Sequence, residues 1–194
     1  MLRHMHMPKI ARQIVPNMPH HVIQRGNRRQ DVFFEDADFR MYLALLREQA
    51  EKGDFSIHAY CLMTNHVHLI ATPWHENGLR KIGEAHRRYT RYINRKKAWR
   101  GYLWQARFDS YPMDEAYAYE ALRYIELNSV VAGMCKHPAD YRWSSARQRI
   151  GKDSSGDFKV APMLQLSVND WEAYWMEALS RRQILDEFLE ISDS

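Results

Sequence analysis

The sequence predicts an α+β fold: an antiparallel sheet flanked by helices, followed by a helical C-terminal tail. One observation is the alternation of short strand-like segments with longer segments whose apolar residues recur at helical spacing. A second is their order, which is strand, helix, strand, strand, helix, strand and helix. Elements in such an order pack as helices against an antiparallel sheet. A length of 194 residues is enough for one domain of this kind with an appendage.

The first half of the chain is expected to contain three strands and one helix. The strands cover residues 19–25, 55–63 and 66–72, and the helix covers residues 36–52. Gly26 ends the first strand, and Pro73 ends the third. Asp36 is a suitable N-terminal cap for the helix.

The second half is expected to contain two helices, one strand and then the tail. The helices cover residues 77–97 and 114–132, and the strand covers residues 107–113. Asp114 and Gly133 suit the two caps of the second helix. Apolar residues between 171 and 179 mark a last amphipathic helix. We therefore expect an N-terminal extension at 1–18, a domain at 19–150 and an acidic helical tail at 151–194.

The charge of the chain is unevenly distributed. The net charge is +4, but residues 153–194 carry −6, so the preceding part carries +10. A basic body predicts a polyanionic partner such as nucleic acid, although a merely soluble surface also fits. No segment has the apolar length of a membrane span or a signal-peptide core, which predicts a cytoplasmic protein without membrane contact. Cys61 and Cys135 lack metal-binding spacing and are expected to be reduced thiols.

His66 and His68 form the first candidate site. Alternate residues of a strand project to one face, so the two imidazoles point together while Val67 points the other way, into the core. Two imidazoles at this spacing can clamp a divalent metal ion. The spacing alone also fits two polar residues on a solvated face of a sheet.

The predicted helix over residues 114–132 carries a second candidate pair. Tyr124 and Asn128 are four residues apart and share one helical face. The apolar stripe of this helix is formed by Ala118, Leu122, Ile125 and Ala132. Tyr124 lies off the centre of the stripe, so it is either a functional side chain or an exposed tyrosine outside the core. A phenol held in line with a metal-activated phosphate can act as a nucleophile and form a phosphotyrosine.

Several stretches, taken in chain order, resemble one family of enzymes. They are residues 21–28 (HVIQRGNR), 60–70 (YCLMTNHVHLI), 89–94 (YTRYIN), 104–108 (WQARF), 124–128 (YIELN) and 138–145 (PADYRWSS). They are similar to stretches of the single-tyrosine HUH transposases, the IS200-like transposases, and more narrowly of the REP-associated tyrosine transposases of bacteria. Each match is weak alone, but together they cover residues 19–150 in order.

The resemblance implies a ferredoxin/RRM-like HUH endonuclease fold for residues 19–150, with the histidine pair on a central strand. It implies that His66, His68 and Asn128 bind Mg²⁺ or Mn²⁺ and that Tyr124 is the catalytic nucleophile. The implied reaction cleaves and rejoins single-stranded DNA beside palindromic hairpins, through a covalent 5′-phosphotyrosine. The resemblance also implies a monomer rather than a dimer, in the bacterial cytoplasm and associated with the nucleoid. A catalytically idle hairpin-binding protein and a metal-dependent nuclease that hydrolyses RNA or DNA are the alternatives.

The chain departs from the family pattern in two places. Ser129 and Val131 replace the proline and arginine of the usual Asn-Pro-Val-Arg-Ala-Gly segment. Asn128 is kept, so the departure concerns DNA affinity or target choice rather than catalysis. The tail at 151–194 lies outside the resemblance, and it either packs on the body or competes with DNA for the basic surface.

Residues 80–107 form the most basic part of the chain, with ten basic residues and only Glu84 as an acidic residue. Aromatic residues are interleaved, which is typical of single-strand binding because charge follows the backbone and rings stack on bases. The predicted DNA-binding residues are Arg25, Asn27, Arg28, Arg29, Arg87, Arg88, Arg91, Arg95, Lys96, Trp104 and Arg107. Solvated arginines on an amphipathic helix, with Tyr89 in the core, are the alternative. His21 either approaches the active site or is an ordinary buried histidine.

Overall fold

The computed structural model describes residues 13–152, 158–163 and 168–180. The main elements are β1 (His20–Arg25), α1 (Asp36–Ala50), β2 (Phe55–Leu62), β3 (His66–Pro73), α2 (Arg80–Lys97), β4 (Asp109–Pro112), α3 (Glu115–Val131) and α5 (Trp171–Ser180). Short helices lie at η1 (Asn27–Arg29), η2 (Pro138–Asp140) and α4 (Ala146–Arg149). The predicted order of strands and helices is confirmed, and only the ends of elements shift by a few residues.

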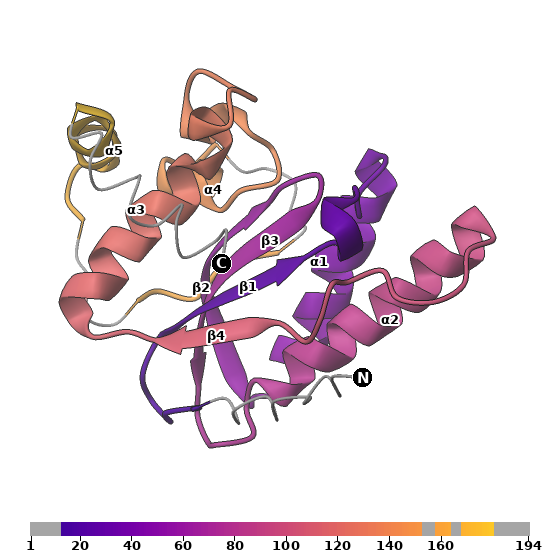
Figure 1. Cartoon of the computed structure of the whole chain (residues 1–194). Coiled ribbons are helices and arrows are strands. Elements are labelled where there is room, and N and C mark those ends of the chain that lie inside the picture. The colour runs from indigo at the N-terminus through magenta and orange to yellow at the C-terminus, as the bar shows by residue number, and fades with distance from the viewer. Residues whose placement is uncertain (1–12, 153–157, 164–167, 181–194) are drawn as a thin grey trace, which may run out of the picture.

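The four strands form one antiparallel sheet in the order β2-β3-β1-β4. Helix α1 connects β1 to β2 and α2 connects β3 to β4, which gives the ferredoxin-like arrangement. Figure 1 shows α1 and α2 on one side of the sheet and α3 with α4 and α5 on the other. The predicted α+β fold is confirmed, and β3 is a central strand.

The larger core fills the space between the sheet and helices α1 and α2. Val67 and Leu69 of β3 point into it and are fully buried. Tyr42 of α1 and Tyr89 of α2 pack there as large buried rings. The Tyr89 hydroxyl donates a hydrogen bond to the Val32 carbonyl at 2.7 Å, so its polar end is satisfied. Tyr89 is therefore a core residue.

A smaller core on the other face of the sheet anchors α5 of the tail, while Phe158 of the preceding segment is buried in the larger core. Tyr174 and Trp175 of α5 are buried against α3. The Ala161 amide donates to the carbonyl of Ile57 at 2.8 Å, which covers part of the outer edge of β2. Residues 158–163 and 171–180 thus pack on the body. No helix in the described ranges is long and apolar enough to cross a membrane.

Candidate active site

The sheet face covered by α3 carries both predicted histidine ligands. His66 and His68 project from β3 toward α3, while Val67 between them enters the opposite core. On the neighbouring strand β1, Arg25 pairs in register with His66, and Ile23 pairs with His68. Strand pairing therefore brings Arg25, predicted to contact DNA, beside the histidine pair.

His21 of β1 joins this pair across the sheet. Its Nε2 lies 3.0 Å from Nδ1 of His68, and the two rings stack with their centroids 5.3 Å apart. His21 is 1% exposed and His68 is fully buried. His21 is thus both a buried histidine and a direct neighbour of His68, one of the predicted metal ligands.

Hydrogen bonds at Nδ1 orient both histidines of the pair. His66 Nδ1 lies 2.6 Å from the side-chain oxygen of Asn65, an acceptor, so Nδ1 carries the hydrogen and Nε2 carries the lone pair. His68 uses Nδ1 toward His21, and its buried Nε2 has no hydrogen-bond partner in the described part of the chain. A buried polar atom without a partner is costly unless a ligand meets it. Nε2 is therefore the nitrogen with which each histidine would bind a metal ion.

Tyr124 of α3 packs directly on these rings. It is 1% exposed, and its ring meets His68 edge-on with 5.5 Å between centroids and His21 with 6.2 Å. Asn128, one helical turn later, is 7% exposed. The face of α3 that carries both predicted residues is therefore buried in the smaller core, against the sheet.

The expectation that Tyr124 lies outside the apolar core was wrong. Helix α3 has no single apolar stripe, because the sheet covers one side of it while α5 and residues 139–146 cover the other. Every residue from 121 to 129 of α3 is buried. The stripe expected from the sequence was drawn for a helix with one solvated face, whereas α3 is covered on both sides.

Burial lowers the pKa of two histidines of the site. Loss of hydration lowers the pKa of His21 to about 4. The pKa of His68 is lowered well below its usual 6.5 by the same effect, and further by the nearby charges of His66, His21 and Arg25. Both imidazoles are therefore neutral near neutral pH, which is the form that binds metal ions.

The donor atoms of the site fit a divalent ion that accepts nitrogen and oxygen ligands. Within the described ranges, no group of three or more His, Cys, Asp or Glu residues could hold a metal ion. The two imidazoles therefore require a ligand of another type, and the amide oxygen of Asn128 is suited to Mg²⁺ or Mn²⁺. The unsatisfied Nε2 of His68 is the observation that favours such a site.

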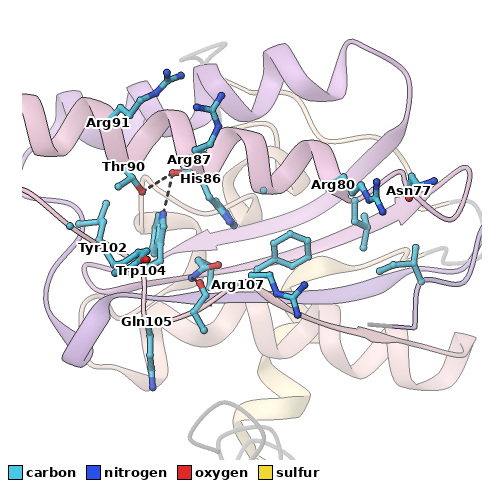
Figure 2. A pocket seen from close by; sticks show the side chains of 18 of the residues that line it. Asn77, Arg80, His86, Arg87, Thr90, Arg91, Tyr102, Trp104, Gln105 and Arg107 are labelled. Carbon is cyan, nitrogen blue, oxygen red and sulfur yellow. Dashed lines mark hydrogen bonds between the residues drawn. The ribbon is translucent and has the colours of Figure 1, made fainter. Parts of the chain in front are cut away.

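A large pocket opens on the opposite, α2 side of the sheet (Figure 2). Its volume is about 1230 Å³, and it lies between α2 and the segment over residues 101–108. Basic and aromatic side chains line it, among them Arg80, Arg87, Arg91, Tyr102, Trp104 and Arg107. Gln24 also lines it and is followed on β1 by Arg25, which lies beside His66 on the other face. Strand β1 thus links the pocket to the histidine site.

The pocket gathers only part of the predicted DNA-binding set. Arg87, Arg91, Trp104 and Arg107 line it, whereas the other predicted residues lie elsewhere. Arg87 is held by both oxygens of Glu84, and Arg88 by Glu48 at 2.6 Å. Lys96 pairs with Glu35 at 2.8 Å and with the buried Asp38. These ion pairs make Arg87, Arg88 and Lys96 the less available members of the set.

Two aromatic residues of the pocket differ from each other in exposure. Trp104 is only 7% exposed, and its indole N–H donates to the His86 carbonyl at 3.3 Å, so it forms a wall of the pocket. Tyr102 is 88% exposed and is the ring presented to solvent. Arg80 was absent from the predicted set, although its helical spacing to Arg87 and Arg91 places all three on one face of α2.

Comparison with known proteins agrees with this fold. The profile of the family described as "Transposase IS200 like" matches residues 14–128, more than half of the chain, and the chain belongs to this family. A solved structure of a REP-associated tyrosine transposase bound to a REP hairpin is similar in fold, with a TM-score of 0.63 and 17% identity over 84% of this chain and 96% of that chain. A candidate transposase from Deinococcus radiodurans R1 shares 24% identity over 61% of this chain and 96% of its own, with a TM-score of 0.41. No curated protein matches the chain.

Proposed function

We propose that this IS200-like transposase cleaves and rejoins single-stranded DNA beside palindromic hairpins, with Tyr124 as the nucleophile. The observation that carries the proposal is the packing of the Tyr124 ring on His68, at 5.5 Å between centroids. This contact joins the predicted nucleophile to the predicted metal site across 56 residues of sequence. The hairpin bound by the REP-associated relative supports the choice of substrate.

In the proposed reaction, the Tyr124 hydroxyl oxygen attacks the scissile phosphorus and loses its proton. The bond from phosphorus to the 3′ oxygen of the preceding nucleotide breaks, and that oxygen leaves as a free 3′-hydroxyl after taking up a proton. The product is a 5′-phosphotyrosine, which a 3′-hydroxyl can attack in reverse to rejoin the strands. A divalent ion at His66, His68 and Asn128 would supply charge stabilisation at the phosphate.

The protein contributes orientation to this reaction. The hydrogen bond between His21 and His68 fixes the ring of His68 and directs Nε2 into the site. Arg25, beside His66, is suited to hold a phosphate oxygen of the strand. The pocket along α2 would hold the hairpin backbone through its arginines, with Tyr102 offered to an unpaired base.

The test is formation of a covalent adduct. Wild-type protein, incubated with end-labelled hairpin DNA carrying a single-stranded flank and Mn²⁺, should give a protein–DNA band on a denaturing gel. Tyr124→Phe keeps the ring and its packing but lacks the nucleophilic oxygen, so the band should disappear. Tyr117→Phe, on the same helix, is the matched control and should leave the band intact.

The outcomes separate the proposal from its alternatives. An undiminished adduct in Tyr124→Phe would remove this residue from the nucleophilic role. Hairpin binding without any metal-dependent adduct would indicate an idle binding protein. Free 5′-phosphate ends, or cleavage of RNA in preference to DNA, would indicate a hydrolytic nuclease.

A further inference from the structure

Helix α3 carries a fully buried carboxylate, Glu126, that takes no part in the proposed chemistry. Oε1 of Glu126 accepts hydrogen bonds from the Ser145 hydroxyl at 3.0 Å and from Arg149 Nε at 2.8 Å. Oε2 accepts from the indole N–H of Trp175 at 3.1 Å. Three donors from the segment after α3, from α4 and from α5 therefore converge on one side chain.

The partners of Glu126 are tied in turn to the sheet. The Tyr60 amide of β2 donates to the Ser145 hydroxyl oxygen at 3.1 Å, and Arg149 donates to the His58 carbonyl of β2 at 2.6 Å. Strand β2 pairs with β3, which carries the histidine pair. Two chains of hydrogen bonds thus run from Glu126 on α3 to the strand beside the histidines.

The position of Glu126 along α3 gives these contacts their significance. Glu126 lies two residues after Tyr124 and two before Asn128, about 200° around the helix from each. It therefore holds the back of α3 while Tyr124 and Asn128 occupy the front. Contacts at the back fix the rotation of a helix about its own axis, and hence the direction of the side chains at the front.

We propose that Glu126 is a positioning residue, whose hydrogen bonds set the rotation of α3 and so hold Tyr124 and Asn128 in register with His66 and His68. This inference rests on the proposed function. With a radius of about 5–6 Å including side chains, a helix that turns by roughly 20° moves its outer atoms by about 2 Å. Misplacement by 1 Å can cost about 100-fold in rate, so a small rotation is enough to impair the reaction.

Stability alone does not require a carboxylate at this position. A buried ion pair is often no more stabilising than apolar residues of similar volume, and its role can be to select one arrangement. The bond from Trp175 serves this purpose, because its direction fixes where the second oxygen of Glu126 lies. The apolar contacts of α3 with the sheet permit sliding and rotation that these directional bonds exclude.

The experiment compares Glu126→Gln and Trp175→Phe with Asp38→Asn. Glu126→Gln keeps the shape but removes the charge. Trp175→Phe keeps the bonds of Glu126 to Ser145 and Arg149, and removes the indole donor together with part of a buried ring. Asp38 is the matched control, since it is another fully buried carboxylate, paired with Lys96 on the α2 side of the sheet. Each protein is assayed at a temperature where circular dichroism shows it folded. The readouts are the adduct rate at saturating hairpin, the hairpin affinity, and Mn²⁺ binding without DNA measured by electron paramagnetic resonance.

We expect Glu126→Gln to lower the saturated adduct rate by about 10- to 100-fold, with hairpin affinity unchanged and Mn²⁺ affinity reduced. Trp175→Phe should show a smaller loss of the same kind, and Asp38→Asn should keep the wild-type rate. An unchanged rate and Mn²⁺ affinity in folded Glu126→Gln would overturn the inference, as would a rate above wild type. Wild-type protein that binds Mn²⁺ but forms no adduct would refute the proposed function alone, and Mn²⁺ affinity would still test Glu126. Wild-type protein that neither binds Mn²⁺ nor forms an adduct would refute both the proposed function and the positioning role of Glu126.

Discussion

Removal of pocket arginines should change how DNA affinity depends on salt. Arg80, Arg91 and Arg107 line the pocket and form no ion pair with any described residue. Each phosphate contact with duplex or single-stranded DNA adds about 0.7–0.9 to the slope of log affinity against log salt concentration. Three contacts therefore contribute a slope of about −2.1 to −2.7, equivalent to a roughly 20- to 40-fold loss of affinity when salt rises fourfold.

The assay is fluorescence anisotropy of a labelled hairpin at salt concentrations from about 50 to 200 mM. Substitution of all three arginines by glutamine should remove most of this slope and leave the fold intact, since all three residues are exposed. Arg47→Gln on α1 is the control, because Arg47 is exposed, pairs with Glu51 and lies outside the pocket. If the triple variant keeps the wild-type slope, the pocket does not hold the DNA backbone and the reasoning fails.

Two further predictions concern stability. Burial lowers the pKa of His58 below 6.5, so the unfolded state binds more protons than the folded state as pH falls. The free energy of unfolding should therefore decrease below pH 6.5. His58 contributes at most about 1.4 kcal/mol per pH unit to this decrease. His58→Gln should flatten that decrease in urea titrations at pH 7.5 and 5.0, and an equally steep loss would contradict the assignment. At Gly26 a Cβ atom would lie 2.2 Å from the Gln30 carbonyl oxygen, so Gly26→Ala should destabilise the turn after β1 by about 1–3 kcal/mol and lower the melting temperature. At Gly53 the space for a Cβ atom is open but φ is +79°, so Gly53→Ala should cost only the strain of that backbone conformation, about 1 kcal/mol. A larger loss of stability in Gly53→Ala than in Gly26→Ala would contradict this prediction.

The elements of the fold were predictable because each carries its own local pattern. Alternation on β3 placed His66 and His68 on one face, and helical spacing placed Tyr124 with Asn128. These patterns depend only on neighbours in the chain, so they are visible without the structure. The predicted strands and helices therefore match the observed ones in type and order.

What covers each element was not predictable, because it depends on segments distant in sequence. The burial of Tyr124 depends on the sheet at its front, and the burial of α3 at its back depends on α5, some 50 residues later. The contact of His21 with His68 depends on the register of β1 against β3. The availability of Lys96 depends on Asp38, from another helix. In each case the missing information was the pairing of surfaces.

The burial of Tyr124 has a consequence for the lifetime of the proposed intermediate. A phosphotyrosine is an activated ester, and its energy is kept only if the next acceptor is a strand end and not solvent. The Tyr124 side chain is 1% exposed and projects from α3 toward the sheet, where it packs against the fully buried His68. A site that excludes water in this way disfavours hydrolysis of a reactive intermediate. In the proposed reaction, the depth of the tyrosine would therefore favour rejoining of strands over their permanent breakage.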